Sequence, residues 1–160
     1  MTIDTFERRE LPSLWVARLT VDVRDTSEIA GVVGGLWDEL RRRLEAAGVP
    51  VDGFGLRTFF GHPDGNRITV AAAYPVAGDR ALPDVEVVEL PAVPDAAVVT
   101  VRAPREELAD AWRAFDAATT AHGLVPDGLH RQVLLATPDD APWTVELQCP
   151  VREDASCPPA

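Results

Sequence analysis

Cysteine is scarce in this chain, which has 160 residues and only two cysteines, Cys149 and Cys157. Their spacing offers neither a disulfide framework nor a set of metal ligands, so we expect two reduced thiols. Long apolar runs are missing too: the most apolar stretch, 68–76, is interrupted by Pro75 and falls far short of the roughly 20 residues that cross a bilayer. The amino-terminal residues carry both charge signs and no apolar run typical of a secretory signal, which predicts a cytoplasmic protein.

Positive charge is in deficit as well. Lys and Arg number 15 against 26 Asp and Glu, which gives a net charge of −11 and an isoelectric point near 4.6. Such a chain is poorly suited to neutralise phosphates, so we expect neither direct nucleic-acid binding nor attachment to an anionic membrane. Apolar residues still make up 46% and charged residues 26%, which suits one globular domain with a real core.

The common motifs of catalysis and cofactor binding are absent. The sequence has no Walker loop, dinucleotide fingerprint, CxxC or HExxH motif. Its histidines, His62, His122 and His130, have no sequence neighbours that suggest a catalytic triad or a metal pair. We therefore expect no cofactor and no metal. The only acid in a persuasive position is Glu146, which could serve charge recognition or, if its pKa were raised, act as a general acid.

The chain matches itself at an offset of 75 residues, which predicts an internal repeat. The ordered matches at this offset are Trp37 with Trp112, Gly48 with Gly123, Asp52-Gly53 with Asp127-Gly128, Pro63-Asp64 with Pro138-Asp139, Val70 with Val145, and Pro75-Val76 with Pro150-Val151. Upstream the register slips by a few residues, and Glu10-Leu11-Pro12 corresponds to Glu89-Leu90-Pro91.

Each half shows the same predicted order of strand, helix, strand, strand. In the first half the pattern predicts strands over 15–23, 56–61 and 67–74, and a helix that begins after the cap Asp25 and ends at Gly48. In the second half it predicts strands over 96–102, 131–136 and 143–151, and a helix from Pro104 to Gly123. A Pro63-Asp64-Gly65-Asn66 turn joins the last two strands of the first half.

This order predicts an α+β fold with a mostly antiparallel sheet and both helices on one of its faces. We expect one domain over residues 1–152, with repeats at about 10–78 and 85–152, and a flexible tail over 153–160. A cleft between the two pseudo-symmetric halves is the predicted place for a ligand.

Strand alternation suggests where polar groups lie. In the last strand Val145, Leu147 and Cys149 should pack on the helices, which leaves Glu146 and Gln148 on the opposite face. Their partners in the first repeat are Ala71 and Ala73, and in the same way Arg57 corresponds to Gln132 and Phe59 to Leu134. This asymmetry favours a pocket built between near-equivalent halves, although a simply solvated face would explain it equally well. Trp37 and Trp112 fit either a core or a groove wall, and Trp143 fits either a cleft mouth or a sheet edge.

Several motifs resemble the GyrI-like small-molecule-binding domains, which also form the effector-binding part of many AraC-type and MerR-type regulators. They are LWDEL in the first helix, ELPA before the second repeat, EELADAWRAF in the second helix and TVELQCPV in the last strand, and the resemblance covers about residues 8–152. It implies a cleft that binds bulky aromatic, often cationic, molecules between aromatic walls and a buried carboxylate.

One departure from this family bears on the chemistry. The family usually has a Glu, and two residues later a Tyr, where this chain has Gln132 and Leu134, whereas Glu146 is retained. Some members resemble hydrolases that open cyclopropane rings of DNA-alkylating compounds with acidic and hydroxyl groups at this place. The substitutions therefore disfavour hydrolysis and weaken cation recognition, and Arg57 would shift the preference toward neutral or anionic ligands.

The first hypothesis is a stand-alone cytoplasmic protein that binds aromatic small molecules, with a sequestering or sensing role. No helix-turn-helix fits ahead of the first strand. A hydrolase that uses Glu146 and an acidic inhibitor that contacts DNA gyrase are the alternatives, and a protein partner is left open. The expected ligand-binding residues are Trp37, Arg57, Phe59, Ala71, Ala73, Trp112, Gln132, Leu134, Trp143 and Glu146.

Overall fold

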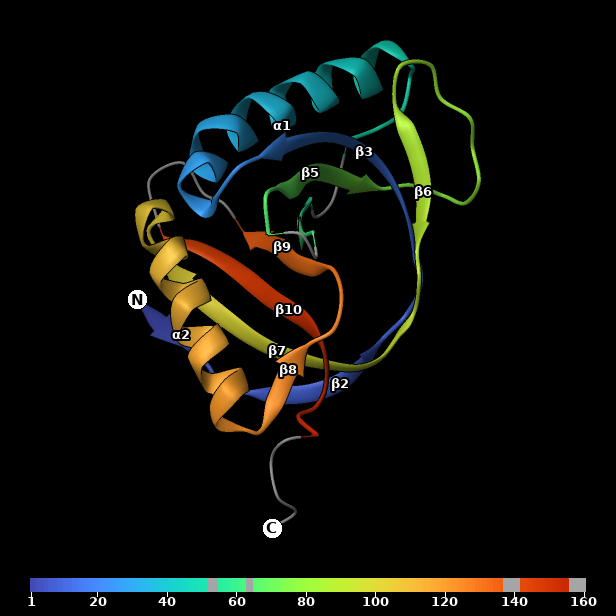
Figure 1. Ribbon diagram of the computed structural model, residues 1–160. Helices are drawn as coiled ribbons and strands as arrows, with labels where there is room; N and C mark the ends of the chain where they lie inside the picture. Colours follow the sequence, from blue (N-terminus) through green and yellow to red (C-terminus); the bar gives the residue numbers. More distant parts are fainter. Residues whose placement is uncertain (52–54, 63–64, 137–141, 156–160) are drawn as a thin grey trace. The chain divides into compact units, whose positions relative to one another are not determined.

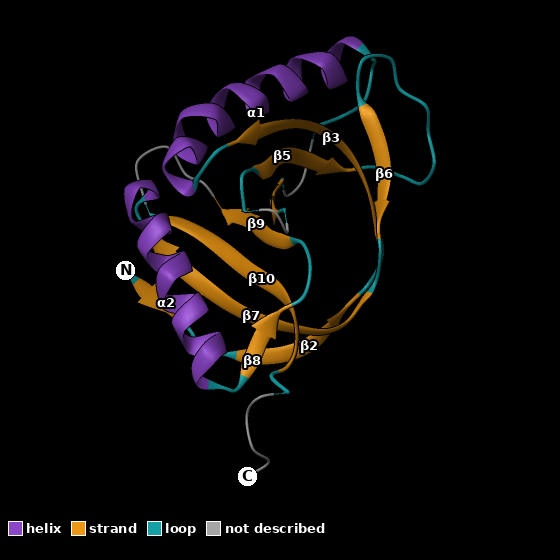
Figure 2. Cartoon of the chain, viewed as in Figure 1, coloured by secondary structure: helices purple, strands orange, loops and turns teal. Residues whose placement is uncertain are grey.

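A computed structural model describes residues 1–51, 55–62, 65–136 and 142–155. The chain divides into two compact units: unit 1 combines Met1–Leu11 with Val93–Ala160, and unit 2 is Pro12–Ala92. Each unit combines antiparallel strands with one α-helix, so the predicted α+β class is confirmed (Figures 1 and 2). No helix in the described part of the chain is long and apolar enough to cross a membrane.

Unit 2 is built on strand β3, which pairs with β5 on one side and β6 on the other, while β5 also pairs with β4; all of these pairs are antiparallel. The helix α1 packs on β3 and β5 (Figure 1). The elements are β3 (Leu14–Val23), the short 3₁₀ turn η1 (Thr26–Glu28), α1 (Ile29–Ala46), β4 (Leu56–Gly61), β5 (Ile68–Pro75) and β6 (Glu86–Leu90).

Local sequence signals explain both ends of α1. The Asp25 carboxylate accepts a hydrogen bond from the backbone N–H of Ser27, which caps the turn that leads into the helix. At the other end Gly48 has a φ of 72°, and the N–H groups of Gly48 and Val49 donate to the carbonyls of Glu45 and Leu44. This is a Schellman motif, in which glycine takes the left-handed conformation at little cost.

Unit 1 is built on β7, which pairs with β1, β2 and β10, while β10 also pairs with β9 and β8. Its elements are β1 (Thr2–Ile3), β2 (Glu7–Leu11), β7 (Val93–Ala103), the 3₁₀ turn η2 (Arg105–Glu107), α2 (Leu108–Ala121), β8 (Leu124–Pro126), β9 (His130–Ala136) and β10 (Trp143–Glu153). Leu108, Ala111 and Phe115 of α2 join Val145 and Leu147 of β10 in one buried core.

The two units share one element order, and in each unit one strand comes from the chain segment that leads into the other unit. The orders β3-α1-β4-β5 and β7-α2-β9-β10 correspond to the strand, helix, strand, strand pattern of the sequence. The strand that precedes each run pairs with the first strand of the other: β2 joins β7 with Leu11 opposite Val93, and β6 joins β3 with Leu90 opposite Leu14. Descent from a duplicated module, and the cleft between the halves, stay predictions.

Two features of the structure differ from the expectations. The sequence did not predict β1, β2, β6 and β8 as strands. Glu153, which the sequence analysis assigned to the tail, lies in β10, where Arg152 and Glu153 pair with Val125 and Leu124 of β8. The remaining tail with Cys157 and the first half of the predicted turn at residues 63–66 lie outside the described residues.

Candidate functional site

The expected ligand-binding residues of unit 1 lie on two opposite faces of its sheet. Gln132 and Leu134 of β9 are register partners of Leu147 and Val145, whose side chains pack on α2. They therefore lie on the helix side, whereas Glu146 points to the other side. We call the set Trp112, Gln132, Leu134 and Trp143 the α2 face.

Large apolar side chains dominate the α2 face. Trp112, Leu134 and Trp143 are each partly exposed and pack against the buried core under α2. The guanidinium carbon of Arg105 lies 5.6 Å from the centre of the Trp143 ring, which is a cation–π distance. The structure thus brings together four of the expected residues on one face of one unit.

Gln132 is the polar centre of this face. Its side chain is 2% exposed, and its Oε1 accepts a hydrogen bond of 2.9 Å from Nε1 of Trp112. Its Nε2 is buried and has no hydrogen-bond partner among the described residues. Two N–H donors are therefore left over at a place where water has no direct access.

Glu146 is held by the chain's own donors. Arg9 of β2 forms an ion pair with its Oε1, and Nε2 of Gln148 donates to the same oxygen at 2.6 Å. The Glu146 side chain is 15% exposed and that of Arg9 is 42% exposed. A carboxylate that accepts two such hydrogen bonds is held as an acceptor, which suits charge pairing better than proton donation.

A buried thiol and a partly buried imidazole lie next to each other in unit 1, a contact that the sequence analysis did not find. Sγ of Cys149 is 3.3 Å from Nε2 of His130. Burial raises the pKa of the Cys149 thiol to about 12, and Asp116 adds to this shift. Burial also lowers the pKa of His130, which Asp116 partly offsets. A thiol with so high a pKa is a poor nucleophile, so this contact is structural.

The expected residues of unit 2 also divide between two faces. Tyr74 contacts α1 through Trp37 and Arg41, so alternate residues of β5 place Val70 and Ala72 on the helix side. Their register partners Phe59 and Arg57 share that side. Ala71 and Ala73 lie on the other face, where their register partners on β4 are Thr58 and Leu56.

Trp37 is tightly enclosed. Its side chain is 7% exposed, and its ring meets that of Tyr74 edge-on at a centroid distance of 4.6 Å. The chain passes so close at Gly55 that a Cβ there would overlap the ring. Nε1 of Trp37 is buried without a hydrogen-bond partner among the described residues. In the predicted repeat Trp37 corresponds to Trp112, which has Gln132 as its acceptor, whereas Arg57 corresponds to Gln132 and has no acceptor atom in its side chain.

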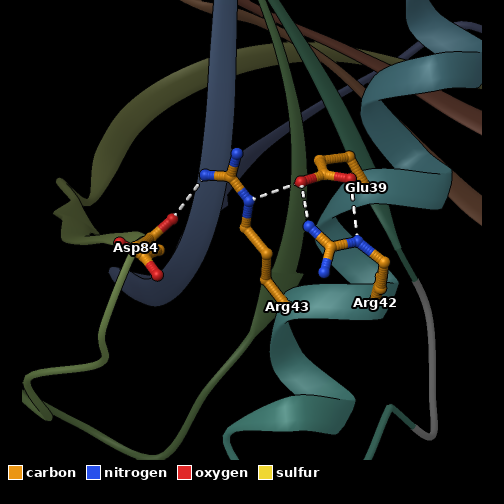
Figure 3. Close-up of polar contacts among 4 residues, drawn as sticks. All are labelled: Glu39, Arg42, Arg43 and Asp84. Carbon is orange, nitrogen blue, oxygen red and sulfur yellow. Dashed lines mark hydrogen bonds and ion pairs between the residues drawn. The ribbon is translucent and has the colours of Figure 1, made fainter.

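A polar surface pocket of about 250 Å³ lies at the carboxyl end of α1. Arg42 and Arg43 line it, and both form ion pairs with Glu39 (Figure 3). Nη1 of Arg43 also donates to the backbone carbonyl of Asp84 at 2.7 Å. The guanidinium groups are thus engaged by the chain itself, and they lie where a helix dipole favours positive charge.

The described residues contain no group of three His, Cys, Asp or Glu side chains that could hold a metal ion. Arg9 and the Cys149–His130 contact are the features that the sequence analysis missed. Arg9 lies 137 residues from Glu146 along the chain, so no local spacing could reveal the pair.

Comparisons with known proteins identify the fold. The chain is similar to the C-terminal domain of EcmrR, with 16% identity over 93% of this chain and 98% of that domain and a TM-score of 0.71. It is also similar to SAV2435 bound to tetraphenylphosphonium, with 12% identity over 93% of this chain and 94% of that one and a TM-score of 0.71. An integron cassette protein of Vibrio cholerae gives 13% identity over 94% and 97% of the two chains and a TM-score of 0.68.

These structures define the class: the chain has a GyrI-like fold, the one that its motifs resemble. The chain is also similar to EcmrR in a complex with DNA, with 18% identity and a TM-score of 0.69. The match covers 93% of this chain but only 57% of the EcmrR chain. No family model and no curated protein matches the sequence.

Proposed function

We propose that this protein binds aromatic small molecules and that the α2 face contributes to the binding surface. The observation that carries the proposal is the arrangement of that face: Trp112, Leu134 and Trp143 are partly exposed around the buried amide of Gln132. Apolar walls with a few placed polar groups are the usual make-up of small-molecule sites. The likeness to SAV2435, which was solved with tetraphenylphosphonium, supports the same conclusion.

Flat indole rings suit a ligand with aromatic groups. Stacking of one aromatic ring on another contributes roughly 0.5–1.5 kcal/mol beyond the burial of apolar area. Because such contacts depend little on the exact outline of the ligand, they favour a broad range of related compounds. This breadth fits a role in sequestering or sensing such compounds in the cytoplasm. The hydrolase and gyrase-contact hypotheses stay predictions, because no described contact bears on a substrate or a partner protein.

Titration calorimetry tests the proposal with three probes of similar aromatic bulk: triphenylphosphine oxide, triphenylacetate and tetraphenylphosphonium. We expect saturable binding of at least one of them. Leu134→Ala should weaken that binding about fivefold, because loss of the side chain removes about 1 kcal/mol of apolar contact. Leu82→Ala is the control, because Leu82 is also partly exposed but lies in unit 2. The proposal fails if no probe binds, or if both variants bind as the wild type does.

A further inference from the structure

We propose that the α2 face selects aromatic ligands that carry a hydrogen-bond acceptor, neutral or anionic, and that Nε2 of Gln132 is the donor that selects them. This inference rests on the proposed function and adds the chemical class of the ligand. It starts from a buried donor that lacks an acceptor among the described residues. Proteins rarely leave such a group unpaired, so an acceptor from outside the chain is expected there.

Trp112 fixes the orientation of the Gln132 amide. An indole nitrogen can only donate, so the atom of Gln132 at 2.9 Å from Nε1 of Trp112 must be the amide oxygen. Rotation of the amide by 180° would bring two donors together and lose this hydrogen bond. The amino group is therefore directed away from Trp112, and neither of its hydrogens has an acceptor among the described residues.

The side chains next to the amide are partly exposed. Leu134 lies two residues further along β9 on the same face, and both Leu134 and Trp112 are partly exposed. Because Nε2 is buried, access to it requires a change of rotamer in these side chains. A trapped water molecule could satisfy the amide equally well, and the experiment below separates the two cases.

The charges near this face favour an anion over a cation. The guanidinium of Arg105 lies over the Trp143 ring and adds positive charge to the α2 face. Glu146 lies on the opposite face and is engaged by Arg9 and Gln148, so it offers the α2 face no counter-ion. Asp116 lies one turn along α2 from Trp112, and burial raises the pKa of its carboxyl.

Unit 2 shows the same excess of donors independently. Nε1 of Trp37 is buried without an acceptor among the described residues. On the α2 face, a ligand that brings an acceptor matches the donor of Gln132, whereas a tetraarylphosphonium cation brings none.

Two of the three probes carry three phenyl rings and an oxygen acceptor, whereas tetraphenylphosphonium carries four phenyl rings and no acceptor, so they also test this inference. We expect the wild-type protein to bind triphenylphosphine oxide and triphenylacetate at least tenfold more tightly than tetraphenylphosphonium. Gln132→Glu keeps an oxygen for Trp112 and replaces only the amino group. It should weaken binding of both acceptor probes at least tenfold and strengthen binding of tetraphenylphosphonium.

Two further variants make the result decisive. Asn66→Asp makes the same chemical change at an exposed position of unit 2, so it controls for the added negative charge and should leave all three affinities unchanged. Gln132→Met, which adds no charge, is the fallback if Gln132→Glu fails to fold, and it should remove the preference for acceptor probes.

Each outcome has one meaning. Tighter or equal binding of tetraphenylphosphonium by the wild type overturns the inference but leaves the proposed function standing. An unchanged preference in both Gln132 variants also overturns it and assigns the amide to a trapped water. If no probe binds at all, the proposed function fails and the inference fails with it.

Discussion

The backbone at Gly55 passes close to the ring of Trp37, and the distances between them give a testable prediction. A Cβ added at Gly55 would lie 1.7 Å from Cη2, 2.4 Å from Cζ3 and 2.8 Å from Cζ2 of Trp37. Carbon atoms pack at about 3.5–4.0 Å, so Gly55→Ala requires the indole to move by about 2 Å. The ring has little space for this, because it is 7% exposed and meets Tyr74 edge-on. We expect Gly55→Ala to lower the free energy of unfolding by about 1–3 kcal/mol.

Urea denaturation of a double-mutant cycle measures this effect and assigns it to Trp37. Trp37→Phe removes the far ring atoms that Gly55→Ala would overlap, at the cost of a cavity of its own. In the Trp37→Phe background the further cost of Gly55→Ala should be at least about 1 kcal/mol smaller than in the wild type.

Gly35→Ala is the matched control, since it makes the same change in α1 two residues from Trp37. Nothing lies within 4 Å of a Cβ at Gly35, and the residue is exposed and helical. Alanine there should stabilise the protein by up to about 1 kcal/mol. The reasoning is refuted if Gly55→Ala is neutral, or if its cost is the same in both backgrounds.

Two other predictions concern unit 1. Burial raises the pKa of Cys149 from 9.0 to about 12, so on a rise in pH the unfolded chain loses this proton before the folded chain does. The free energy of unfolding should therefore fall between pH 9 and 12 by at most about 1.4 kcal/mol per pH unit. Urea denaturation at several pH values should show a weaker fall in Cys149→Ala, and an equal fall in variant and wild type would contradict the assignment. The ring centroid of Phe6 lies 4.1 Å from that of His122, in a stacked arrangement, and 6.1 Å from that of Phe115. Phe6→Ala should therefore lower the free energy of unfolding by about 1–3 kcal/mol and speed amide hydrogen exchange in β2. Unchanged exchange would show that the hydrogen bonds between β2 and β7 hold the segment without Phe6.

The helices could be predicted from the sequence because their signals are local. The cap at Asp25, the glycine at Gly48 and the apolar residues at helical spacing lie within one stretch of chain, and the structure buries Val33, Trp37, Leu40 and Leu44 of α1. Such signals depend only on the geometry of one helix, so they predict the helix without knowledge of the elements that pack against it.

The expected ligand site shows where local reasoning ends. Alternation along β10 placed Val145 and Leu147 on the helix side and Glu146 on the other side, which the structure confirms. Alternation cannot say which residue of β9 lies opposite which residue of β10. The observed register pairs Gln132 with Leu147, so Gln132 and Glu146 lie on different faces although they belong to one expected set.

Strand β2 sets the electrostatics of unit 1. The ladder between β2 and β7 places Arg9 opposite Ala96 and Arg8 opposite Ala97, so alternate residues of β2 point to opposite faces. Arg9 therefore shares the face of Glu146 and neutralises it, while Arg8 pairs with Asp95. A one-residue shift of β2 would bring Glu10 or Arg8 to that face instead. Whether Glu146 presents a free charge thus depends on the register of β2, which precedes the whole of unit 2 in the chain. Glu146 is therefore unavailable to a cation, although the sequence keeps the acid at this position.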